Sequence, residues 1–354
     1  MKFNVPFLPD RHYTDFLKAH KALIYSCHVS LPDPSIPDAR HKIGGKDLSA
    51  IIRYLRELNL PQVYVLLNSR VHGRDIYSGK AGIEPIRDRL QKLTDSGVIQ
   101  GIVFADPYLL NVLSRTSADL VSRLEAVPSV NCMIDSYDKF TSFLDIIATS
   151  GFKPPETLVP DRSINRRRDD LAELSEQIRR HHPGMAIELL ANEGCIYHCP
   201  FKLTHDALIS LHHITGDMDV HEINRKLGCM DYLYHHPHLI FKSPFIRPED
   251  VARYSGVADR IKICGRTLGP GFLINAITAY MAGRYDGNLL SILDAADWLA
   301  EKYEIDNHRL PKDFFKKLVT CHKVCDDCRY CRTLAQTHIK KRPLTLPDLT
   351  LPGH

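Results

Sequence analysis

The sequence predicts an α/β protein, a (β/α)8 TIM-type barrel with an appended C-terminal helical cysteine-rich module. Two observations predict the barrel: short apolar runs alternate with longer amphipathic segments, and polar residues follow nearly every run. Each run is bounded by polar or turn residues, as is typical of strands buried on both faces of a parallel sheet. Eight alternations over 354 residues favour a closed barrel, with a doubly wound open sheet as the main alternative.

The eight apolar runs are the expected strands. In chain order they are 22–26, 62–67, 101–105, 130–134, 156–160, 186–190, 238–242 and 260–264. Between them, apolar residues recur at helical spacing, for example over 48–60, 83–97 and 169–181, so helices are expected there.

Polar residues come directly after these runs, at the positions that ring the C-terminal mouth of a barrel, where active sites lie. They are Cys27, His28, Asn68, Asp106, Asp135, Asp161, Arg162, Asn192, Glu193, Ser243, Gly265 and Arg266. Any one of them could simply end a strand or cap the next helix. The ring as a whole indicates a site.

Three parts are expected along the chain: the barrel over 1–285, the helical cysteine-rich module over 286–335 and an extended tail over 336–354. After the last run, Gly265, Gly269 and Gly271 open a helix. Such a loop offers backbone N–H groups to a phosphate or other anion, although glycines also serve plain turns.

Composition points to a cytoplasmic protein that does not span a membrane. The chain is 44% hydrophobic and carries a net charge of only +4, and its N-terminus lacks the apolar core of a signal peptide. Uninterrupted apolar stretches long enough for a bilayer are missing from the sequence. Ten cysteines in such a chain favour metal or redox chemistry over structural disulfides.

The densest group of cysteines is "CHKVCDDCRYC", with Cys321, Cys325, Cys328 and Cys331. Four thiolates at this spacing could hold one zinc ion or an iron–sulfur cluster, and one dense run favours the cluster. The first three also match the spacing of radical S-adenosylmethionine enzymes. In that class the motif normally follows the first barrel strand, so an auxiliary cluster is the preferred interpretation here.

A second group of cysteines is expected at the barrel mouth. Cys195 and Cys199 follow the run 186–190, Cys229 lies in the same long connection, and Cys27 ends the first run. We expect an iron–sulfur site that begins with Cys195 and Cys199. Cys132 and Cys264 lie in or at the end of apolar runs, where a buried thiol is ordinary.

Several polar residues near this site are candidates for chemistry. Proton donors or acceptors are Glu193, His198 and His205, and cations for an anionic substrate group are Arg162, Arg166 and Arg266. Structural roles compete with each assignment, since Glu193 could cap a helix and His205 could only pack.

Four segments carry a family resemblance: "DRSINR" (161–166), "ANEGCIYHCPFKLTH" (191–205), "IFKSPFIRPEDV" (240–251) and "DRIKICGRT" (259–267). Together they resemble the collagenase-like proteins of peptidase family U32, and the resemblance is good across residues 155–270. The resemblance implies a barrel. It also implies a [4Fe-4S] cluster on four cysteines, as in members implicated in oxygen-independent hydroxylation of ubiquinone precursors or RNA bases. By that analogy the ligands are Cys195, Cys199 and Cys229, with Cys27 as the fourth.

The expected function is therefore that of an iron–sulfur redox enzyme with one or two clusters, acting on a small molecule or nucleobase, with a possible protein partner. Three alternatives stay open. They are a radical S-adenosylmethionine-like enzyme, a peptidase or other hydrolase, and a non-catalytic binding module stabilised by zinc on the C-terminal cysteines. For hydrolysis, neither H-E-x-x-H nor G-x-S-x-G occurs in the sequence.

Overall fold

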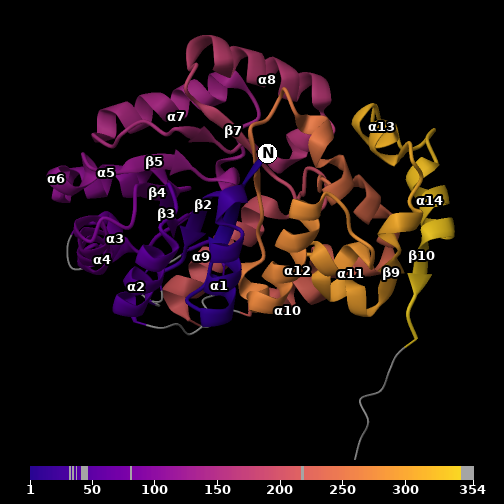
Figure 1. Cartoon of the computed structure of the whole chain (residues 1–354), viewed down its shortest axis with the longest axis horizontal. Helices are drawn as coiled ribbons and strands as arrows, with labels where there is room; N and C mark the ends of the chain where they lie inside the picture. Colours follow the sequence, from indigo (N-terminus) through magenta and orange to yellow (C-terminus); the bar gives the residue numbers. More distant parts are fainter. Residues whose placement is uncertain are drawn as a thin grey trace, which may run out of the picture.

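The structure is a computed structural model that describes residues 1–31, 33, 36, 38–40, 47–79, 82–216 and 219–343. Eight parallel strands form one sheet that curls into a nearly closed barrel, and helices surround it (Figure 1). The predicted (β/α)8 fold is confirmed. In the described part of the chain, no helix is both long and apolar enough to cross a bilayer.

The strands follow one another around the barrel in the order β5-β4-β3-β2-β1-β8-β7-β6. Their bounds are β1 (Lys2–Phe7), β2 (Ile24–Val29), β3 (Gln62–Leu67), β4 (Gly101–Phe104), β5 (Glu125–Pro128), β6 (Thr157–Leu158), β7 (Ala186–Leu190) and β8 (Arg260–Lys262). The two ends of the sheet meet just before β6. There the Ala126 N–H donates to the Lys153 carbonyl at 3.2 Å, and the Lys153 N–H donates to the Leu124 carbonyl at 2.9 Å.

Two of the expected strands are wrong. Residues Val130–Cys132 and Pro237–Lys242 form 3₁₀ turns, and the strand near the first of them is β5, a few residues earlier. Strand β1 at the N-terminus was not expected, because Asn4 and Pro6 interrupt its apolar pattern. Short buried apolar runs occur in turns as well as strands, so periodicity alone does not separate the two.

Helices cover the outside of the sheet, as the spacing of apolar residues predicts. Their bounds are α1 (Arg11–Ala19), α2 (Leu48–Leu58), α3 (Arg74–Tyr77), α4 (Glu84–Asp95), α5 (Pro107–Thr116), α6 (Ala118–Val121), α7 (Tyr137–Ser150), α8 (Arg168–His181), α9 (Lys202–Thr215), α10 (Val220–Leu227), α11 (Cys229–His235) and α12 (Gly269–Ala282). Helix α2 shows how capping residues set the two ends of a helix. The Asp47 side chain caps its first turn by accepting the Ala50 N–H, and Asn59 ends it in the left-handed conformation.

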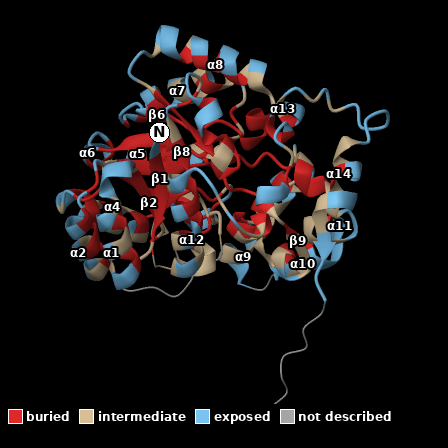
Figure 2. Cartoon of the chain, turned by 45° about the vertical axis from the view of Figure 1, so that its right-hand side comes forward, coloured by how far each residue is buried: buried red, intermediate tan, exposed pale blue. Residues whose placement is uncertain are grey.

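The core lies between the sheet and these helices, and the helix faces that look away from the sheet are exposed (Figure 2). Successive residues of a strand point to opposite faces of the sheet. Outward-facing Val5 and Val65 therefore join the apolar core, whereas Asn4 and Tyr64 line the barrel interior. This alternation decides which side chains can reach a site inside the barrel.

The C-terminal part packs directly on the barrel. It contains β9 (Tyr303–Ile305), α13 (Phe314–Val319), α14 (Tyr330–His338) and β10 (Ile339–Lys341), and β10 pairs antiparallel with β9. Phe314 of α13 is buried with its ring 5.9 Å from that of Phe241, so this part shares the core of the barrel. The first residues of the tail expected over 336–354 lie in the end of α14 and in β10, and 344–354 lie outside the described residues.

Candidate functional site at the barrel mouth

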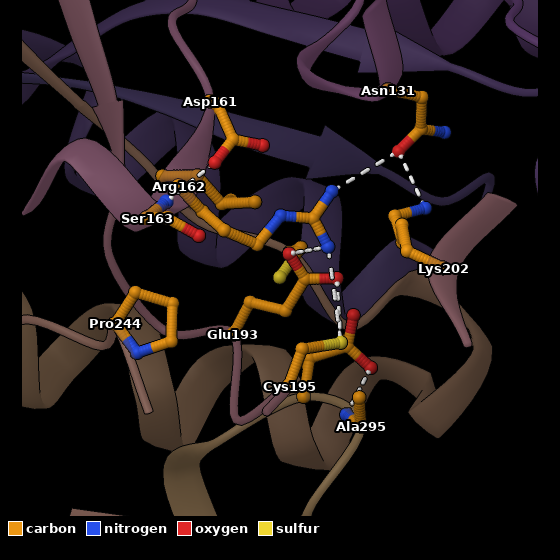
Figure 3. A network of polar contacts seen from close by, with 12 residues as sticks. Asn131, Asp161, Arg162, Ser163, Glu193, Cys195, Lys202, Pro244 and Ala295 are labelled. Carbon is orange, nitrogen blue, oxygen red and sulfur yellow. Dashed lines mark hydrogen bonds and ion pairs between the residues drawn. The ribbon is translucent and has the colours of Figure 1, made fainter. Parts of the chain in front are cut away.

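A buried ion pair lies at the carboxyl ends of β6 and β7. Arg162 follows β6 in a 3₁₀ turn (Arg162–Arg166), and Glu193 follows β7. Arg162 Nη1 lies 2.6 Å from Glu193 Oε2, and both side chains are 5% exposed (Figure 3). The contact is an ion pair and not an aligned hydrogen bond. Sequence reasoning selected both residues, and the structure brings them together.

A second cation, Arg40, also lies near this carboxylate. Its Nη2 atom lies 3.5 Å from Glu193 Oε1 and 3.1 Å from Asp294 Oδ2. Burial is the largest single effect on Asp294 and would raise its pKa, but the Arg40 charge together with hydrogen bonds from Cys264, Arg40 and the Ala295 backbone lowers the pKa overall. Two carboxylates and two guanidinium groups therefore balance one another here.

Asn131 links this pair to a further group of charges on α9. Its Oδ1 atom accepts hydrogen bonds from Arg162 Nη2 at 3.2 Å and from Lys202 Nζ at 3.0 Å (Figure 3). Lys202 also pairs with Asp206, one helical turn further along. Burial, followed by the charge of Arg162, lowers the pKa of Lys202.

Cys195 belongs to this network. Its thiol donates to Glu193 Oε1 at 3.5 Å and lies 3.8 Å from Arg162 Nη1. Burial and then the Glu193 charge raise the pKa of Cys195 well above its usual value. The loop before it is held tightly, because a Cβ atom on Gly194 would lie 2.4 Å from the Cβ atom of Ala296.

Cys199 interacts electrostatically with both Cys195 and Cys229. Burial raises the pKa of Cys229 to about 11, and Cys199 is the second cause of that shift. Cys199 also contributes to the raised pKa of Cys195. Cys199 is thus the electrostatic neighbour that Cys195 and Cys229 have in common.

Cys27, expected as the fourth ligand, lies in the apolar core instead of in the cavity lining at the mouth. It points outward from β2 into the apolar core with no exposed surface, and burial raises its pKa to about 12. Its neighbour His28 points into the barrel instead. Cys264 lies at the mouth, where its thiol is 3.2 Å from Asn192 Oδ1.

The two histidines predicted as proton donors or acceptors, His198 and His205, contact residues outside the Arg162–Glu193 pair. His198 has a left-handed backbone, with φ of 45°, and its N–H donates to Ser163 Oγ at 3.3 Å. His205 lies on α9, with Nε2 3.0 Å from Asn224 Nδ2, which fits a packing role.

The other predicted arginines divide between the mouth and the core. Arg266 lines the rim of the mouth and pairs with Asp38 at 2.8 Å. Arg166 is buried and donates to the Ser243 carbonyl, so it supports the fold.

The glycine-rich loop reaches the site through one residue. Gly265 lines the cavity at the mouth, with φ of 117°, and a Cβ atom there would lie 2.2 Å from the Phe272 ring. Gly269 and Gly271 lie in the first turn of α12, with open space beside both.

The C-terminal cysteines lie near the Cys195–Cys199 loop. Burial raises the pKa of Cys331 to about 11, with Cys321 as the second cause and smaller effects from Cys325 and Cys328. Lys323, between them, donates to the Arg166 carbonyl at 3.2 Å and lies 5.5 Å from the centre of the Tyr197 ring.

The thiols at the mouth suit a soft metal in their chemistry. Arg162 and Lys202 act on Cys195 and Cys199 to lower their pKa values, against the effect of burial, and so favour the thiolates that bind metals. Across residues 1–31, 33, 36, 38–40, 47–79, 82–216 and 219–343, no group of three or more His, Cys, Asp or Glu side chains is already arranged to hold a metal ion.

Sequence reasoning missed several members of the network. Lys202 lies in the segment 191–205, which carries part of the family resemblance, and Asp206 comes directly after that segment, so their spacing of four residues could have paired them on a helix. Arg40 and Asp294 stand 254 residues apart, and no local pattern connects them.

Together these features define a (β/α)8-barrel protein with a charged, cysteine-bearing mouth. The uncharacterized protease MJ1657 of Methanocaldococcus jannaschii is 30% identical to this chain over 306 residues, which are 85% of this chain and 83% of that protein. The solved structure of the U32 peptidase Mk0906 matches with a TM-score of 0.50 and 17% identity, over 75% of this chain and 92% of that chain. No family model matches. The chain belongs to the U32 peptidase family.

Proposed function

We propose that this chain is an iron–sulfur redox enzyme of the U32 family, with a [4Fe-4S] cluster at the barrel mouth held by Cys195, Cys199 and Cys229. The proposed reaction is an oxygen-independent hydroxylation, or a related modification, of a small molecule or nucleobase. One observation carries the proposal: the Cys195 thiol contacts the buried Arg162–Glu193 pair at the carboxyl ends of the strands, and Cys199 interacts electrostatically with both Cys195 and Cys229. Barrel enzymes place their reacting atoms at this end.

The bound cluster would supply one-electron chemistry, and the chain would supply orientation and charge. Glu193 Oε1 accepts from the Cys195 thiol and would take up its proton if Cys195 bound a cluster. Arg162 and Lys202 offset the negative charge of the thiolates, and Asn131 fixes both cations by accepting a hydrogen bond from each. Arg266, at the rim, pairs with Asp38 and is placed to contact a polar group of the substrate.

A second metal is proposed on Cys321, Cys325, Cys328 and Cys331, as a second iron–sulfur cluster or as zinc. Their mutual influence on the pKa of Cys331 supports one shared site. Because Cys325 and Cys328 are exposed, the chemistry is assigned to the mouth and not to this cluster.

Peptide hydrolysis is the second candidate, since both relatives carry protease or peptidase names. A thiol nucleophile works best when its pKa is lowered by a cationic neighbour. The pKa of Cys195 is raised instead, and its thiol donates to a carboxylate. Cys195 therefore lacks the activation that a thiol nucleophile requires.

Variants separate metal binding from chemistry at the mouth. Cys195→Ala and Cys199→Ala are expected to lose iron and activity when they replace the wild-type gene in a deletion strain. Glu193→Gln and Arg266→Ala are expected to lose activity while they keep iron and a native circular dichroism spectrum. Full activity in both of the latter variants would mean that the mouth is a structural metal site.

A further inference from the structure

A cavity of about 70 Å³ lies inside the barrel, directly below the mouth. Side chains of β3, β4 and β5 make one wall of it apolar, through Leu66, Val103 and Val127. The opposite wall, from β7 and β8, is polar and carries Glu188 and Lys262. The volume exceeds what a single water molecule requires.

Glu188 leaves one carboxylate oxygen unused. The residue is 1% exposed, and its Oε1 atom accepts a hydrogen bond from Asn4 Nδ2 at 2.8 Å and lies 3.4 Å from Lys262 Nζ. Its Oε2 atom is buried and has no hydrogen-bond partner within the described residues. A buried carboxylate oxygen without a donor is costly, so this atom marks a place for a ligand donor.

His28 offers a second acceptor beside it. Glu188 can only accept, so the Asn4 amide must point its NH₂ group at Glu188 and its oxygen at His28. His28 Nδ1 lies 2.8 Å from that oxygen and must therefore carry the proton. The other ring nitrogen, Nε2, then has a free lone pair.

Lys262 supplies the matching donor. It is 8% exposed. Within the described part of the chain, its ammonium group makes one hydrogen bond, to Glu188. An ammonium group has three N–H donors. The polar wall therefore presents a donor next to an unused acceptor.

The charges around the cavity balance. Its lining contains three cations and three anions, namely Arg40, Lys262 and Arg266 with Glu188, Glu193 and Asp294. A ligand with net charge would upset this balance, so a neutral molecule fits best.

We propose that this cavity binds a small neutral molecule with an amide-type edge, an N–H group beside a carbonyl. The N–H donates to Glu188 Oε2, the carbonyl accepts from Lys262 Nζ, and the apolar part of the ligand packs against Leu66, Val103 and Val127. The inference rests on the proposed function in taking this molecule for the substrate of the mouth, but the binding itself requires no metal.

Ligand-observed NMR on the full-length protein tests the proposal with 2-piperidone, a six-membered ring amide. Binding in the millimolar range is expected for so small a probe. N-methyl-2-piperidone, which keeps the carbonyl and lacks the N–H, is expected to bind at least about tenfold more weakly. Equal binding of the two probes, or no binding of 2-piperidone, would overturn the proposal.

Two variants place the site. Glu188→Gln keeps an oxygen that accepts from Asn4 but turns an NH₂ group toward the ligand. This variant is expected to bind 2-piperidone about tenfold or more weakly than the wild-type protein. Glu125→Gln is the matched control, because Glu125 is a buried carboxylate that accepts from Tyr64 at 3.1 Å and does not line the cavity. An equal loss in both variants would contradict the assignment.

The comparison of the two probes needs no variant, so the proposal stays testable if Glu188→Gln does not fold. Selective binding to protein that carries no iron would uphold this inference and refute the proposed redox function. Protein that contains iron but binds the two probes equally would refute this inference and leave the proposed redox function standing.

Discussion

Arg162→Gln should strongly destabilise the protein, because it removes one partner of the buried pair with Glu193. The two charged groups lie 2.6 Å apart and are each 5% exposed. Without the guanidinium, a carboxylate stays buried with Arg40 at 3.5 Å as its remaining cation. Loss of one partner from a buried pair costs about 3–5 kcal/mol. Because Arg40 compensates in part, a loss near the lower end, about 3 kcal/mol, is expected.

A matched control separates burial from distance. Arg180 and Glu176 on α8 are also 2.6 Å apart, but their side chains are 64% and 70% exposed. Arg180→Gln is therefore expected to change the free energy of unfolding by no more than about 0.5 kcal/mol.

Urea unfolding at 25 °C, followed by far-UV circular dichroism, measures both effects. The double variant Arg162→Gln/Glu193→Gln should recover part of the loss, since it leaves no unpaired charge. A loss below about 1 kcal/mol in Arg162→Gln, or no recovery in the double variant, would refute the view that this pair is buried and mutually dependent.

Three further predictions concern the loops and the thiols. Gly194→Ala should destabilise the protein by about 1–3 kcal/mol, since its Cβ atom would lie 2.4 Å from Ala296, whereas Gly184→Ala meets open space and should change stability little; equal effects in urea unfolding would contradict the close approach. In metal-free protein at pH 8, Cys229 should react with iodoacetamide far more slowly than exposed Cys325, because a thiol with a pKa of about 11 is roughly 0.1% thiolate at that pH. The reaction of Cys229 should become faster as the pH approaches 11. Peptide mass spectrometry measures the order of labelling, and rapid labelling of Cys229 at pH 8 would contradict its raised pKa. Replacing Cys325 and Cys328 together by serine should remove one metal site and leave the iron at the mouth, and loss of all iron would mean that the two regions share one cluster.

The barrel was predictable because its signal is spread over the whole chain. Alternating apolar runs and amphipathic helices do not depend on any one element, so the fold prediction survived two wrong strands. The turn Pro237–Lys242 shows why individual runs mislead. Leu239, Ile240 and Phe241 are buried, as in a strand, but part of their packing comes from Phe314 of the C-terminal part.

The site was predictable only where its members follow strands or share a helix. Arg162, Glu193 and Cys195 satisfy that condition. Whether Cys27 reaches the mouth depends on which face of β2 points into the barrel. The sequence leaves that open, because adjacent residues of a strand always face opposite sides. Glu188 and Lys262 were hidden for a similar reason, since each stands within a short apolar strand.

Metal analysis after anaerobic purification tests the central proposal most directly. Wild-type protein is expected to contain iron and acid-labile sulfide, and Cys195→Ala/Cys199→Ala is expected to lose the share bound at the mouth while its C-terminal cysteines keep their metal. Zinc alone in the wild-type protein, or an unchanged iron and sulfide content in the double variant, would contradict an iron–sulfur cluster at the barrel mouth.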